Sequence, residues 1–183
     1  MTRTLLALTL FALLSAQSAQ RAPESGPARI ILIRHAEKPD DAGDPHLSAV
    51  GRARAKRLVA YITTDPAMIR LGSPVALFAT ETTKHDDGQR TQETLAPLSR
   101  SLKLPVQTPF LGKQYAALAQ QILANRAFAG KTILICWNHE AIPELAAALG
   151  VVPQPPKWKR SDFDRVYVIS YAGGKVTLAA YRY

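Results

Sequence analysis

The chain has 183 residues, of which 47% are apolar, 20% are charged and one is a cysteine. A single cysteine cannot close an intrachain disulfide or supply a multi-thiolate zinc site, so both of these classes are excluded. The apolar content is too high for a chain disordered by composition, and the length fits one domain with its own core.

Basic residues outnumber acidic ones, 23 against 14, which gives a formal net charge of +9. Such a charge favours encounters with anions. The sequence has no helix striped with Lys and Arg, no aromatic cluster for base stacking and no nucleic-acid motif. We therefore expect a small phosphorylated substrate as the partner and no nucleic acid, and the oligomeric state is left open.

The first residues have the pattern of a secretory signal. Arg3 precedes an apolar run over residues 5–14, and small residues occupy the positions three and one before a cleavage site after Ser18. We predict a signal peptide over 1–18, a flexible lead-in over 19–28, and export to the periplasm or the medium. The alternative is a retained anchor. The run is shorter than the roughly 20 residues that cross a bilayer, so we expect no stable membrane insertion after signal removal.

From residue 29 onward, short apolar runs alternate with segments of helical periodicity. Strands are predicted at 29–33, 74–79, 106–108, 131–137, 165–171 and 175–181, and helices after the N-cap Ser48 and at 89–102, 115–128 and 144–149. Strands that alternate with helices favour an α/β fold, a three-layer α/β/α sandwich with a mostly parallel central sheet, over residues 29–183.

Ligand sites of such sheets lie at the carboxyl ends of the strands. The polar residues that follow the three most apolar strands are Arg34 and His35, then Thr80 with a loop leading to Arg90, then Asn138, His139 and Glu140. Two arginines, two histidines and a carboxylate are thus expected at one edge of the sheet.

These groups suit phosphoryl transfer. Arginine presents a planar, permanently charged fork that matches phosphate oxygens. A neutral imidazole can attack phosphorus, and a second, protonated imidazole can stabilise the equatorial oxygens of the transition state. A carboxylic acid can protonate the departing alkoxide.

Four motifs, in order along the chain, resemble those of the histidine phosphatase (phosphoglycerate mutase-like) superfamily. They are RHAEK at 34–38, Leu47 and Ser48 with Gly51, Arg54 and Ala55, the segment RTQET at 90–94, and Trp137 to His139. The resemblance covers roughly residues 29–150, and residues 163–169 are similar to the closing strand of small exported members.

The resemblance implies roles for individual residues. His35 would be the phosphorylated nucleophile, and Arg34, Arg90 and His139 would complete the phosphate pocket. Glu140 resembles the acid of the HD pair in phytase-type members. The implied reaction needs no metal and no cofactor.

The sequence departs from the family pattern in the residue that would serve as general acid. Arg90 follows Thr80 by ten positions, so an inserted loop flanks the site, and no Asp or Glu occurs between Glu93 and Glu140. The general acid is therefore either Glu140 or one of Asp86 and Asp87 in the inserted loop.

The sequence also suggests roles for other polar residues near the motifs. Glu37 and Lys38 either support the pocket or form a solvated ion pair. His46 and His85 are expected to be loop histidines, and Cys136 a buried, unreactive thiol.

Two functions from different classes remain. The first is an exported, metal-independent phosphatase that hydrolyses a phosphomonoester through a phosphohistidine on His35. The second is a catalytically idle phosphate-binding or envelope-associated relative of the same fold. The natural substrate is left open.

Overall fold

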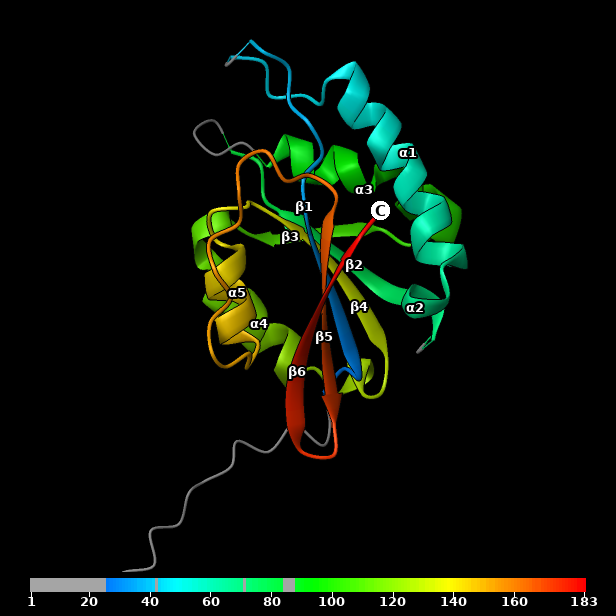
Figure 1. Ribbon diagram of the computed structural model, residues 1–183, viewed down its shortest axis with the longest axis vertical. Coiled ribbons are helices and arrows are strands. Elements are labelled where there is room, and N and C mark those ends of the chain that lie inside the picture. The colour runs from blue at the N-terminus through cyan, green and yellow to red at the C-terminus, as the bar shows by residue number, and fades with distance from the viewer. Residues whose placement is uncertain (1–25, 42, 71, 84–87) are drawn as a thin grey trace, which may run out of the picture.

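A six-stranded sheet forms the centre of the computed structural model (Figure 1). The structure describes residues 26–41, 43–70, 72–83 and 88–183. The predicted signal peptide over 1–18, most of the predicted lead-in, and the residues His85, Asp86 and Asp87 lie outside the described residues.

The strands lie in the order β3-β2-β4-β1-β5-β6. Their bounds are β1 Arg29–Arg34, β2 Pro74–Thr80, β3 Val106–Phe110, β4 Thr132–Trp137, β5 Arg165–Ala172 and β6 Lys175–Arg182. β1, β2, β3 and β4 pair in parallel, whereas β5 is antiparallel to both β1 and β6. The sheet is therefore mixed and mostly parallel, as predicted.

Five α-helices and two short 3₁₀ turns connect the described strands. Their bounds are α1 Ala49–Thr64, α2 Pro66–Ile69, α3 Gln89–Leu102, α4 Tyr115–Ala124 and α5 Ile142–Ala148, with 3₁₀ turns η1 Gly112–Gln114 and η2 Arg126–Phe128. In the part of the chain that the structure describes, no helix combines the length and the apolar character needed to span a bilayer.

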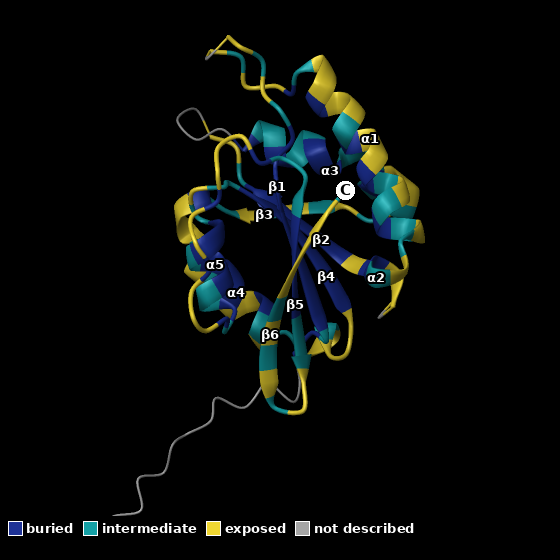
Figure 2. Ribbon diagram, viewed as in Figure 1, coloured by how far each residue is buried: buried dark blue, intermediate teal, exposed yellow. Residues whose placement is uncertain are grey.

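Helices cover both faces of the sheet, because alternate residues of each strand point to opposite sides. Ile31 and Ile33 of β1 pack in one core with α1, α2 and α3, while Ile30 and Leu32 pack in a second core with α4 and α5. Figure 2 shows the buried sheet between the partly exposed helices. The predicted three-layer α/β/α sandwich is confirmed.

The predicted helix over 115–128 is too long by four residues. α4 ends at Ala124 because Asn125 adopts an extended conformation, and its side chain accepts a hydrogen bond from the N–H of Ala127. This bond starts η2 in place of a further α-helical turn. The short helix α2, capped by Asp65, was not predicted.

The strand order brings four chain segments to one edge of the sheet. β2, β4 and β1 are adjacent and parallel, so their carboxyl ends meet there. Because β5 runs antiparallel to β1, its amino end lies at the same edge. The segment 150–164, which precedes β5, therefore reaches the candidate site from the side opposite to β2.

Candidate active site

The loop that follows β1 is held by α1 and α3. The N–H of Ala36 donates to Oγ1 of Thr94 at 2.9 Å, and the N–H of Ser48 donates to the carbonyl of Glu37 at 2.9 Å. A Cβ atom at Gly51 would lie 2.3 Å from that carbonyl oxygen, so a glycine is required for this close approach of α1. The second and third motifs thus position the loop that carries the first.

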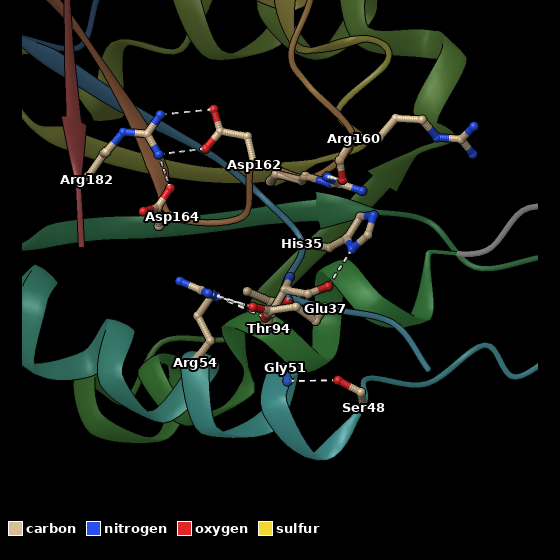
Figure 3. A network of polar contacts seen from close by, with 12 residues as sticks. His35, Glu37, Ser48, Gly51, Arg54, Thr94, Arg160, Asp162, Asp164 and Arg182 are labelled. Atoms are coloured by element: carbon tan, nitrogen blue, oxygen red, sulfur yellow. Dashed lines mark hydrogen bonds and ion pairs between the residues drawn. The ribbon is translucent and has the colours of Figure 1, made fainter. Parts of the chain in front are cut away.

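His35 is the first residue after β1, and its side chain is buried at 8% exposure. Its Nδ1 lies 2.7 Å from the carbonyl oxygen of Ala36 (Figure 3). Because a carbonyl oxygen only accepts, Nδ1 carries the proton in this contact and Nε2 keeps its lone pair. Burial lowers the pKa of His35 to about 4, and the charges of Arg34, Arg90 and His139 act in the same direction. The ring is therefore neutral at pH 7.

Arg34 is the last residue of β1, and it is also buried. Its Nη1 donates to the backbone carbonyl of Arg160, and its guanidinium carbon lies 4.0 Å from the centre of the Phe163 ring. Burial lowers the pKa of Arg34 to about 10, and the charge of Arg160 contributes. The guanidinium therefore stays charged at pH 7. Its buried Nε has no hydrogen-bond partner.

The segment before β5 is tied to the last two strands by Asp162. This carboxylate lies 2.5 Å from Nη2 of Arg165. It also lies 3.0 Å from Nη1 of Arg182 (Figure 3). The carbonyl of Asp162 accepts a hydrogen bond from Nε1 of Trp158 at 2.7 Å. These contacts fix the position at which the carbonyl of Arg160 meets Arg34.

Arg90 lies in the first turn of α3 and contacts the loop before α1. Its guanidinium donates to the carbonyl of Asp44 at 2.5 Å and to that of His46 at 3.3 Å. The ring of His46 lies in turn 2.5 Å from Oε1 of Glu93. The loop is thereby held against α3, and the charge of Arg90 reaches His35.

His139 lies two residues beyond β4, and its side chain is 11% exposed. Burial lowers its pKa, and the charge of Arg34 acts in the same direction. Oε1 of Glu140 lies 3.9 Å from Nε2 of His139, but the Glu140 side chain is 78% exposed. The structure thus brings His35, Arg34, Arg90 and His139 into one electrostatically coupled group, with Glu140 at its solvent side.

Glu37 and Lys38 do not form an ion pair with each other. Both Glu37 carboxylate oxygens accept from Nε of Arg54, at 2.8 and 2.9 Å. Burial favours a higher pKa for Glu37, but the hydrogen bonds from Arg54 and from the backbone outweigh burial and hold the pKa below its usual value. Lys38 is exposed. The solvated-pair alternative is therefore wrong, because Glu37 joins the loop after β1 to α1.

A cavity of about 340 Å³ lies beside His139. It is lined by His139, Glu140, Glu144, Lys157, Trp158 and Arg160. The sequence analysis did not single out Arg160, Glu144 or Lys157 as site residues. The sequence feature that could have indicated them is the basic segment 157–160, which lies directly before the predicted strand at 165. Whether this segment reaches the site depends on β5 being antiparallel to β1.

Three solved structures resemble this fold. A protein assigned as the phosphohistidine phosphatase SixA from Agrobacterium tumefaciens has a TM-score of 0.53 and 11% identity, over 85% of this chain and 99% of that one. The mycobacterial glucosyl-3-phosphoglycerate phosphatase Rv2419c, in complex with inorganic phosphate, has a TM-score of 0.56 and 13% identity, over 85% of this chain and 96% of that one. The chain shares the fold of these two proteins.

A third structure, assigned as SixA from Nakamurella multipartitia, has a TM-score of 0.50 and 16% identity, over 87% of this chain and 98% of that one. No protein-family model matches the chain, and no curated protein is significantly similar to it. These likenesses establish the fold. The roles assigned to His35, Arg34, Arg90, His139 and Glu140 stay predictions.

Cys136 is fully buried in β4, and burial raises the pKa of its thiol, as expected for an unreactive cysteine. Within the described ranges, no cluster of three or more His, Cys, Asp or Glu side chains could hold a metal ion.

Proposed function

We propose that the protein is an exported phosphatase that hydrolyses a small phosphomonoester through a phosphohistidine on His35, without a metal. The observation that carries this proposal is a buried, neutral imidazole directly beside the positive charges of Arg34 and Arg90. Two proteins of the same fold, the one assigned as SixA from Agrobacterium tumefaciens and the mycobacterial Rv2419c, are named as phosphatases, which supports the same class of reaction.

His35 has the properties that a phosphoryl acceptor needs. Its Nδ1–H is engaged by the carbonyl of Ala36, which orients the ring and leaves the lone pair on Nε2. Since its pKa is about 4, no proton has to be removed before attack at pH 7.

The surrounding cations supply the charge that holds a phosphate dianion. The buried Nε of Arg34 lacks a protein partner, so a phosphate oxygen would satisfy it. The charge of Arg90 is oriented by two backbone carbonyls. A bound dianion also favours the protonated form of His139, which then donates to an equatorial oxygen.

The reaction would proceed in two in-line steps. Nε2 of His35 attacks phosphorus, the bond from phosphorus to the ester oxygen breaks, and the departing alkoxide takes a proton from Glu140 in its acid form. Water then attacks the phosphohistidine, its proton passes to the Glu140 carboxylate, and the electron pair of the N–P bond returns to Nε2. Phosphate is released and both residues are restored.

The exposure of Glu140 favours a second candidate, an idle phosphate-binding relative. A carboxylate that is 78% exposed is a weakly positioned acid, and it is the candidate acid that lies within the described part of the chain. This protein would bind phosphate esters through Arg34 and Arg90 but would not turn them over.

Hydrolysis of ethyl phosphate by the purified protein separates the two candidates, because an alkoxide leaves poorly without a proton from an acid. We expect turnover by the wild type and none by His35→Ala. Binding of inorganic phosphate without turnover by the wild type would instead identify the idle relative. Export is tested by fractionating cells that produce the full chain and by sequencing the mature amino terminus, which we expect at Ala19.

A further inference from the structure

The cavity beside His139 carries opposite charges from two separate chain segments. Glu140 and Glu144 come from the turn after β4 and from α5. Lys157 and Arg160 come from the segment that precedes β5. The buried Trp158 lies between the two cations in the sequence and contributes to the lining.

These charges do not neutralise one another by direct contact. Among the residues that the structure describes, no ion pair joins either glutamate to Lys157 or Arg160, and the contact recorded for Glu140 is the one with His139. Oε2 of Glu144 is buried and has no hydrogen-bond partner. A buried carboxylate oxygen without a donor leaves the negative charge of Glu144 uncompensated, so a cationic group bound in the cavity would stabilise it.

The cavity adjoins the proposed phosphate pocket at His139. His139 belongs to both, and the charges of Arg160 and Glu140 act on the pKa of Arg34 as well as on that of His139. Figure 3 shows the Arg160 side chain extending on the side of the network where the His35 ring lies, away from Asp162 and Arg182. A phosphate bound at Arg34 and His35 would therefore direct its ester substituent toward this cavity.

We propose that this cavity binds the leaving group of the substrate, and that the leaving group carries both a protonated amine and an acidic group. The proposal rests on the phosphatase function proposed above. The amine would meet Glu140 and Glu144, and the acidic group would meet Lys157 and Arg160. A volume of about 340 Å³ is at the lower end for ligand pockets, which favours a leaving group of amino-acid size.

Leaving groups with a single charge fit this lining less well. A purely anionic group would lie beside the unpaired oxygen of Glu144, and a purely cationic group would lie beside Lys157 and Arg160. Each would gain one attractive contact and one repulsive contact.

Four phosphate esters separate the contributions of the two charges. They are phosphoserine, with amine and carboxylate; phosphoethanolamine, with the amine alone; 3-phosphooxypropanoate, with the carboxylate alone; and ethyl phosphate, with neither. Their dissociation constants are measured by titration calorimetry on the full chain carrying His35→Ala, so that binding is recorded without turnover. We expect phosphoserine to bind about tenfold more tightly than either singly charged ester.

Substitutions in the same background identify the contacts. The affinity gained from the amine is the ratio of the dissociation constants of 3-phosphooxypropanoate and phosphoserine, and Glu144→Gln should reduce this ratio about tenfold. The affinity gained from the carboxylate is the ratio for phosphoethanolamine and phosphoserine. Lys157→Gln should reduce that ratio about threefold, because Lys157 is exposed. Lys175→Gln, at the exposed start of β6 at the opposite end of the sheet, removes the same charge and is the matched control.

Equal affinity for all four esters would overturn the proposal, as would a Glu144→Gln variant that binds phosphoserine as tightly as its parent. Tighter binding of 3-phosphooxypropanoate than of phosphoserine would also overturn it and would indicate a simple anion site. Hydrolysis of ethyl phosphate and p-nitrophenyl phosphate by the wild type is measured in parallel. If those esters are turned over, failure of the binding prediction leaves the phosphatase function standing.

Discussion

Arg34 donates a hydrogen bond from Nη1 to the backbone carbonyl of Arg160, a residue 126 positions later in the chain. The contact joins the end of β1 to the segment before β5 and leaves the rest of the Arg34 guanidinium for a ligand. In the proposed reaction, this one arginine would both hold the segment before β5 and bind phosphate. This double use explains why the planar, multi-donor guanidinium is suited to this position and a lysine is not.

Replacing Arg34 by Lys should lower kcat/KM for p-nitrophenyl phosphate by roughly 10- to 100-fold, because one ammonium cannot reach both the Arg160 carbonyl and two phosphate oxygens. Arg126→Lys, on the exposed η2 turn, is the matched control and should have the activity of the wild type. Steady-state kinetics on both variants check this. Unchanged activity of Arg34→Lys would show that the guanidinium geometry is not used.

A covalent phosphohistidine should be detectable on His35. Rapid quenching after mixing with a labelled substrate should trap phosphate that is stable in base and labile in acid, and peptide mapping should place it on the peptide that contains His35. EDTA should not reduce turnover, because arginines supply the positive charge that metal ions supply elsewhere. Turnover without any trapped label would contradict the covalent mechanism.

Glu140→Gln should slow hydrolysis of a simple alkyl phosphate by about 10²- to 10⁴-fold, since an alkoxide leaves poorly without a proton. The same substitution should hardly change hydrolysis of p-nitrophenyl phosphate. The two rates measured side by side decide the role of Glu140. Equal losses on both substrates would mean that Glu140 positions His139, and no loss on either would move the acid to Asp86 or Asp87.

The neutrality of His35 predicts a pH dependence of stability. Its pKa is about 4 in the folded protein against 6.5 for an exposed histidine, so the unfolded chain binds a proton that the folded chain does not. The stabilisation is complete above pH 6.5 and is lost as the pH falls toward 4. Between pH 6.5 and 4, the unfolding free energy of His35→Asn should therefore fall by about 3 kcal/mol less than that of the wild type.

Denaturant unfolding of wild type and His35→Asn at several pH values measures this difference directly. Because the comparison uses the change with pH and not the stability at one pH, the packing defect of the substitution cancels. Parallel curves for the two proteins would show that folding does not lower the pKa of His35.

Local sequence patterns determined much of this fold. The apolar run that forms β1 ends where Arg34 begins the polar motif, and α3 has the predicted bounds Gln89–Leu102 although Pro97 lies within it. Such features depend on residues a few positions apart, because strand burial, helix periodicity and capping act over one or two turns of chain. The rule that parallel strands end at one edge of the sheet then predicts, from the sequence, that His35 and His139 lie close together.

The tertiary structure alone decided which distant groups became partners. The pairing of Glu37 with Arg54, the exposure of Glu140 and the meeting of Arg34 with Arg160 depend on how α1, α5 and the segment before β5 pack on the sheet. No local pattern encodes these contacts, since each joins residues from separate elements whose approach is set by core packing. The antiparallel insertion of β5 beside β1 is the decisive step, because it carries Lys157 and Arg160 to the edge where β1 and β4 end.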